Sequence, residues 1–153
     1  MFYDRKPYKK VKPLLMMSSA ANMRETVQNL ADTFNDSDKR ETSYFDFYDE
    51  SLITYGFPPH FSNDKEGFKQ FIHLLWKAFP DIRITFEDVI IEGNKIAGRY
   101  ILEGTHQGEF LGLQPTNKQF KVNGMTIFYF QNSKWVKRWN LVDMPALMEQ
   151  LKD

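Results

Sequence analysis

The first half of the chain places apolar residues at helical spacing. Between residues 22 and 34 they recur at positions i, i+3, i+4 and i+7, which predicts an amphipathic helix. The residues concerned are Val27, Leu30, Ala31 and Phe34. The polar run 35–38 ends this pattern, and we predict a second helix over 39–48 and a short extended piece over 52–55.

A third helix is predicted before Pro80. Asn63, with Glu66 three residues later, has the spacing of a capping box at a helix start. The apolar face that follows is heavy and aromatic: Phe68, Phe71, Ile72, Leu75 and Phe79. Pro80 then ends the helix, because proline cannot continue the hydrogen-bond ladder.

Beyond Pro80 the apolar spacing changes from helical to alternating, as expected for half-buried strands. Two hairpins are predicted, from strands over 82–92, 95–105, 119–130 and 134–142. Their turns fall at Gly93 and at 131–133, and a short helix follows Asp143. Helices first and antiparallel strands afterwards predict an α+β fold, with the helices on one face of a curved antiparallel sheet.

Residues 1–17 stand apart from these patterns. The first sixteen residues carry five cations against a single acid, Asp4, and their apolar run is too short for a secretory signal. We therefore expect a flexible basic extension over 1–17 and a single domain over 18–153. The alternative is that translation starts at Met16 or Met17.

Composition narrows the possible functions. The 153 residues are 42% hydrophobic and 16% aromatic, enough for a substantial core or an apolar cavity. Lys+Arg and Asp+Glu both number 20, and this balance argues against a nucleic-acid partner. No run approaches the roughly 20 apolar residues of a membrane helix. We expect a cytoplasmic protein without a membrane span.

The absence of cysteine removes disulfides, thiol nucleophiles and Cys-ligated metals. The three histidines do not have the spacing of metal ligands. Gly-rich phosphate loops and a nucleophile elbow are also missing. These patterns predict no metal and no cofactor, and leave cofactor-free acid/base chemistry or simple binding.

Asp143 is the first candidate for acid/base chemistry. Alternation along the last strand predicts that it shares a face with Trp135, Lys137, Trp139 and Leu141. A carboxyl desolvated by such neighbours has a raised pKa, which suits a general base near neutral pH. Asp143 also stands where the N-cap of the final helix would be, and spacing alone leaves both interpretations open.

His106 and three tyrosines are weaker candidates. Glycines 104 and 108 around His106 predict a bulge or a close backbone approach that could aim the ring inward. A loop histidine at the rim is the alternative, and the sequence alone favours it. Tyr55, Tyr100 and Tyr129 could each donate to an oxyanion, although packing is the commoner role of such tyrosines.

Three motifs follow one another in the second half: A-F-P-D at 78–81, G-T-H-Q-G-E-F-L-G-L-Q-P-T-N-K at 104–118, and W-N-L-V-D at 139–143. Their order and spacing closely resemble the SnoaL-like polyketide cyclase family. The resemblance implies a nuclear transport factor 2-like cone, in which a curved antiparallel sheet is wrapped by helices around an apolar pocket. It also implies a homodimer formed through the sheet.

The family's named cyclases close a ring of an aromatic polyketide ester by intramolecular aldol condensation, without metal or cofactor. Their catalytic carboxylate is the Asp of W-x-x-x-D, which corresponds to Asp143. The chain departs from the pattern in three places. Lys137-Arg138 stands where many members have His or Glu, Thr54-Tyr55-Gly56 replaces a segment that often carries His, and P-T-N-K replaces P-T-G-K.

The leading expectation is a cofactor-free enzyme acting on a small hydrophobic carbonyl compound. Asp143 would take a proton from the carbon alpha to the carbonyl, and His106 or a tyrosine would stabilise the enolate oxygen. The substrate would be held by Trp139, Tyr55, Tyr100, Tyr129 and Phe110.

One alternative is a non-catalytic ligand-binding or dimeric interaction domain, with a pocket filled by its own side chains and Asp143 as a helix cap. Another is an isomerase, dehydratase or epoxide hydrolase.

Overall fold

The computed structural model describes residues 13–152, with side-chain surroundings from residue 20 onward, so the predicted basic extension lies mostly outside this range. The helices are α1 (Pro13–Asn35), α2 (Arg40–Ser43), the 3-10 turn η1 (Tyr44–Phe47), α3 (Lys65–Ala78) and α4 (Met144–Leu151). The strands are β1 (Tyr48–Tyr55), β2 (Arg83–Glu92), β3 (Lys95–Thr105), β4 (Gln119–Gln131) and β5 (Lys134–Val142).

The five strands form one sheet in the order β1-β5-β4-β3-β2. Strands β2 to β5 form the two predicted antiparallel hairpins. Strand β1, predicted as a shorter extended piece, instead pairs parallel with β5. The prediction of a wholly antiparallel sheet is therefore wrong at this edge. Two parallel strands need a long connection, and the chain between β1 and β5 is long enough to provide it. Alternation of apolar residues does not show which strand β1 pairs with, so the sequence could not predict this.

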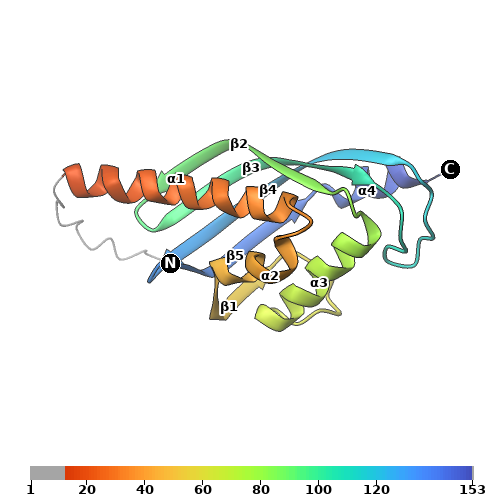
Figure 1. Ribbon diagram of the computed structural model, residues 1–153, viewed down its shortest axis with the longest axis horizontal. Coiled ribbons are helices and arrows are strands. Elements are labelled where there is room, and N and C mark those ends of the chain that lie inside the picture. The colour runs from red at the N-terminus through yellow and green to blue at the C-terminus, as the bar shows by residue number, and fades with distance from the viewer. Residues whose placement is uncertain (1–12, 153) are drawn as a thin grey trace, which may run out of the picture.

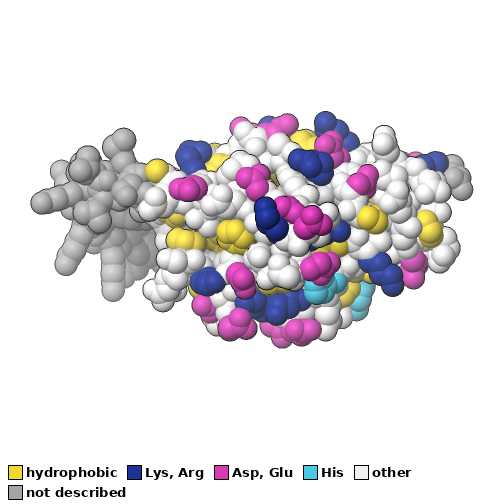
Figure 2. All heavy atoms as spheres, viewed as in Figure 1, with side chains coloured by type: hydrophobic (Ala, Val, Ile, Leu, Met, Phe, Trp, Pro, Cys, Tyr) yellow, Lys and Arg dark blue, Asp and Glu magenta, His cyan; other side chains and the backbone are white. Residues whose placement is uncertain are grey.

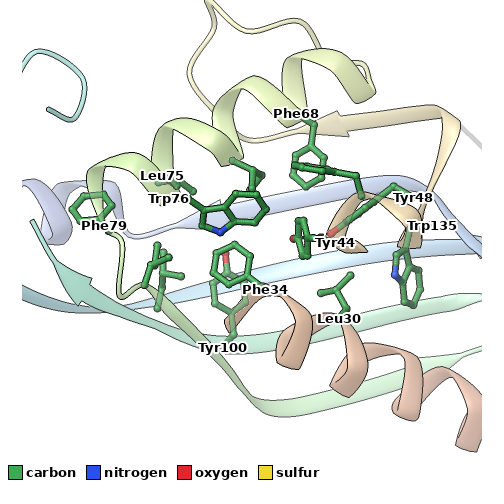
Figure 3. Packing of buried hydrophobic residues seen from close by; sticks show 14 of the residues in the cluster. Leu30, Phe34, Tyr44, Tyr48, Phe68, Leu75, Trp76, Phe79, Tyr100 and Trp135 are labelled. Carbon is green, nitrogen blue, oxygen red and sulfur yellow. Dashed lines mark hydrogen bonds between the residues drawn. The ribbon is translucent and has the colours of Figure 1, made fainter. Parts of the chain in front are cut away.

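The helices α1, α2 and α3 lie on one side of the sheet, with α1 running along it (Figure 1). The core fills the space between these two layers (Figure 3). Its centre is aromatic: Trp76 of α3 lies 5.8 Å from Phe34 of α1 and 5.6 Å from Tyr44 of η1, measured between ring centroids. Aromatic pairs at such distances stabilise a core beyond their buried area.

The helix starts differ from the sequence expectations in detail. Helix α1 begins at Pro13, earlier than predicted, and the predicted second helix divides into α2 and η1. Asp64, not Asn63, caps α3, with its side chain accepting a hydrogen bond of 2.9 Å from the Gly67 amide. Asn63 instead uses its carbonyl to accept the amide of Thr54 on β1.

One extra residue in β5 reverses the faces on which its side chains lie. Trp135 pairs with Phe130, but Lys137 pairs with the adjacent Tyr129, so Val136 forms a bulge. Trp135 is consequently fully buried under the helices, whereas Trp139 is 46% exposed. The prediction that these two indoles share a face is wrong.

The helix-bearing side shows charged side chains of both signs interspersed, with apolar side chains scattered among them (Figure 2). No helix within residues 13–152 combines the length and the apolarity needed to cross a membrane.

Candidate functional site

A small cavity lies between the helices and the inner face of the sheet. Its volume is about 50 Å³, room for a few water molecules and well below the roughly 300 Å³ of a typical ligand pocket. Most of its wall is apolar, contributed by α1, α3, α4 and three strands. Four lining residues carry polar groups: Tyr44, Tyr100, Arg138 and Asn140.

Arg138 enters this interior because the bulge at Val136 turns it inward. On β1 its neighbour is Thr54, and its guanidinium carbon lies 5.0 Å from the centroid of the Phe68 ring. Its Nε is buried without a hydrogen-bond partner. Within residues 20–152 no carboxylate forms an ion pair with it. The residue as a whole is half-buried, so a cation without a counter-ion lies at the edge of an apolar cavity.

Tyr100 and Asn140 form a second polar element of the cavity. The Tyr100 hydroxyl donates a 2.7 Å hydrogen bond to Asn140 Oδ1. The ring reaches β5 by crossing Gly124 of β4, where an added Cβ would lie 2.2 Å from the Tyr100 Cζ. Glycine at 124 is therefore required for this contact, which fixes the orientation of both polar groups.

The buried phenols are hydrogen-bond donors at neutral pH. The hydroxyls of Tyr44 and Tyr48 lie 3.0 Å apart (Figure 3). Burial raises the pKa of Tyr44 and Tyr100, which nearby Arg138 opposes only in part, and raises that of Tyr48 well above its ordinary value. These groups stay protonated and neutral, so they do not compensate the Arg138 charge.

Asp143 caps the last helix, as one of the two sequence interpretations predicted. Its Oδ1 accepts a 3.0 Å hydrogen bond from the Ala146 amide. The residue is exposed, so the prediction of a desolvated carboxyl is wrong. It follows the outward-facing residues of β5 in the alternation. Its two sequence neighbours, Val142 and Met144, nevertheless line the cavity.

His106 is fully buried rather than placed at the rim. Its Nδ1 accepts the Thr116 amide at 3.2 Å, and its carbonyl accepts the amide of Asn117, which has a positive φ of 58°. The predicted close backbone approach is confirmed at Gly108, whose amide donates to the Ala78 carbonyl at 3.0 Å. His106 thus holds the loop between β3 and β4, and its ring lies beside Phe79 rather than among the residues that line the cavity.

The five residues expected to hold a substrate divide between two faces of the sheet. Tyr100 and Phe110 line the inner cavity. Trp139 and Tyr55 stack at 4.1 Å on the outer face, and Lys137 lies between 5.2 and 5.9 Å from the rings of Trp139, Tyr55 and Tyr129. Sequence reasoning missed Arg138 and Asn140 as site residues, because strict alternation assigned them to the other face.

The outer face carries an apolar groove of about 770 Å³. Its exposed apolar side chains come from β2, β4 and β5: Ile90, Met125, Ile127, Trp139 and Leu141. Contiguous apolar surface of this kind marks an interaction site.

Comparisons with known proteins agree with this architecture. The model of the SnoaL-like polyketide cyclase family matches residues 24–151. Among solved structures, AclR from Streptomyces galilaeus, a proposed hydroxylase, is 22% identical with a TM-score of 0.75, covering 86% of this chain and 96% of its own. IdmH from Streptomyces antibioticus, a proposed polyketide cyclase, is 25% identical with a TM-score of 0.70, covering 84% and 96%. No curated protein matches the sequence.

Proposed function

The chain belongs to the SnoaL-like polyketide cyclase family, and we propose that it converts a small hydrophobic carbonyl compound by cofactor-free acid/base chemistry at the inner cavity. The observation that carries this proposal is the convergence of Tyr100, Arg138 and Asn140 in an otherwise apolar cavity. Oriented donors in a site that excludes water stabilise the oxygen of an enolate as its negative charge develops.

Asp143 is the base in this proposal. Its carboxylate is exposed and does not line the cavity, although its neighbours Val142 and Met144 do. Acting as the base therefore requires the side chain to leave its capping bond to the Ala146 amide and turn toward the cavity during catalysis. The carboxylate would take a proton from the carbon alpha to the carbonyl, and the enolate so formed would attack a second carbonyl of the same molecule. That step forms a carbon–carbon bond and an alkoxide, which takes the proton back. Tyr100 and Arg138, rather than His106, would donate to the enolate oxygen, because His106 does not line the cavity.

The test combines binding with proton exchange. We expect aromatic ketones and esters to quench tryptophan fluorescence saturably and to exchange their alpha protons in D₂O faster with the protein than without it, as followed by NMR. Trp139→Phe is the matched control, because it removes the outer-face indole and leaves Trp76 and Trp135. Quenching that vanishes in this variant would place the ligand on the outer face and contradict the proposal.

A non-catalytic ligand-binding or dimeric interaction domain is the second candidate. The small cavity volume, the capping role of Asp143 and the apolar outer groove favour it. It predicts compounds that bind without any proton exchange.

The outer groove also supports a homodimer, whether the protein is an enzyme or a non-catalytic domain. Leu141 is 72% exposed and Met125, its cross-strand partner, is 65% exposed. We expect Leu141→Glu to fold normally but to elute as a monomer in size-exclusion chromatography with light scattering, because a charge would be buried between copies. Leu111→Glu, at an exposed residue that does not line the groove, should leave the dimer unchanged. A monomeric wild-type protein would contradict the proposal.

A further inference from the structure

We infer that the ligand of the inner cavity is a small cyclic or aromatic carboxylate, and that Arg138 binds its carboxylate group. This deepens the proposed function by naming a substrate class, and it rests on that function in taking the same cavity as the site. It concerns binding rather than turnover, so the two ideas can fail separately.

The first observation is an uncompensated charge. The Arg138 guanidinium faces the Phe68 ring, which attracts a cation without neutralising it. Its strand neighbour Thr54 is neutral, and so are the phenols of Tyr44 and Tyr100. No Asp or Glu is among the residues that line the cavity. A negatively charged ligand would supply the counter-ion that Arg138 lacks.

The second observation is a surplus of donors over acceptors. A guanidinium offers five N–H groups, and the Nε of Arg138 is buried without a hydrogen-bond partner. Asn140 already uses Oδ1 to accept from Tyr100, which leaves its amide protons for a ligand. Thr54 Oγ1 is buried on the same inner face without a partner. A carboxylate matches this set, because it only accepts hydrogen bonds.

The shape of the donor points to the same ligand. The planar fork of an arginine pairs with a carboxylate through two parallel hydrogen bonds, which a neutral ketone or amide cannot form. The apolar remainder of the cavity wall would receive the ring of the ligand. Because the cavity of about 50 Å³ is smaller than the roughly 150 Å³ that holds a benzene ring in a protein interior, its lining side chains must move apart as the ligand binds. Lys137, the preceding residue, contributes nothing inside, because it lies against the outer-face rings.

Benzoate and benzamide test the inference, because they share size and shape and differ in charge. By isothermal titration calorimetry we expect wild type to bind benzoate about tenfold or more tighter than benzamide, as hydrogen bonds to charged groups exceed neutral ones. Arg138→Met should erase this preference through loss of benzoate affinity, and Arg138→Lys should retain part of it. Lys137→Met, which removes a cation from the outer face of the same strand, should leave the preference intact.

Thermal melting gives an independent readout. Benzoate should raise the melting temperature of wild type and not that of Arg138→Met, because only a ligand that binds the native state stabilises it. Without ligand, Arg138→Met should melt no lower than wild type, since it removes a half-buried charge that has no ion-pair partner and leaves an apolar side chain beside Phe68. If Arg138→Met fails to fold, the affinities of wild type and Arg138→Lys for benzoate and benzamide still test the inference.

Equal affinity of wild type for benzoate and benzamide would overturn the inference, as would a preference that survives Arg138→Met or disappears in Lys137→Met. Absence of benzoate binding at millimolar concentration would also overturn it. Failure of the proton-exchange assay would instead contradict the acid/base function and leave carboxylate binding standing.

Discussion

Replacing Asp143 by asparagine is expected to abolish turnover while the fold stays intact. Asparagine is as good an N-cap as aspartate, so its side-chain oxygen can still accept the Ala146 amide and hold the start of α4. It cannot take a proton from carbon, and loss of a general base costs about 10²- to 10⁴-fold in rate. The measurements are the alpha-proton exchange rate of a bound compound and the melting temperature.

Two further variants separate the base from the cap. Asp143→Ala should lose activity to the same extent and also lower the melting temperature, because α4 loses its capping bond. Asp64→Ala removes the equivalent cap from α3 and should lower the melting temperature without affecting the exchange rate. An Asp143→Asn protein that turns over a genuine substrate at the wild-type rate would show that Asp143 is not the base.

The largest loss of stability is expected from Gly56→Ala. Gly56 follows β1 with a positive φ of 93°, and a Cβ there would lie 1.6 Å from the carbonyl oxygen of Asn140. That oxygen belongs to the backbone, so the end of β1 would have to separate from β5. We expect the free energy of unfolding to fall by about 3 kcal/mol or more, at the upper end of overpacking effects. Urea denaturation measures this change.

Gly93→Ala is the matched control for that experiment. Gly93 also has a positive φ, of 58°, but no atom lies within 4 Å of its added Cβ in the exposed turn between β2 and β3. It should therefore cost only the backbone strain of a side chain at positive φ, about 1 kcal/mol. Equal losses in the two variants would mean that strain, rather than contact with β5, sets the cost at Gly56.

The long strands were predictable because their signals are local. Alternating apolar residues and turn residues placed β3 and β5 at the bounds that the structure has. The direction of β1 was not predictable, because a four-residue alternation contains no information about its partner. The partner of His106 was equally hidden, since Thr116 meets it only when the loop between β3 and β4 closes.

The inner site was missed for a geometrical reason. Side chains along a strand repeat every two residues, so one unrecognised extra residue assigns every position beyond it to the wrong face. Counting by twos from Trp135 put Trp139 inside and Arg138 outside. The useful signal was the departure from the family pattern at Lys137-Arg138, which placed two cations where many relatives have His or Glu.

The bulge at Val136 divides the nine residues of β5 into two parts whose side chains alternate in opposite phase. Before it, an indole faces the helices, and beyond it the rings and aliphatic side chains face outward while the guanidinium and amide face inward. The bulge therefore sets which face each residue beyond it occupies, and removing the extra residue would exchange the inward and outward side chains from Lys137 onward. The inward and outward residues of β5 can vary independently only while one extra residue is kept in this part of the strand, so a one-residue deletion at Val136 would be far more damaging than a substitution of its side chain.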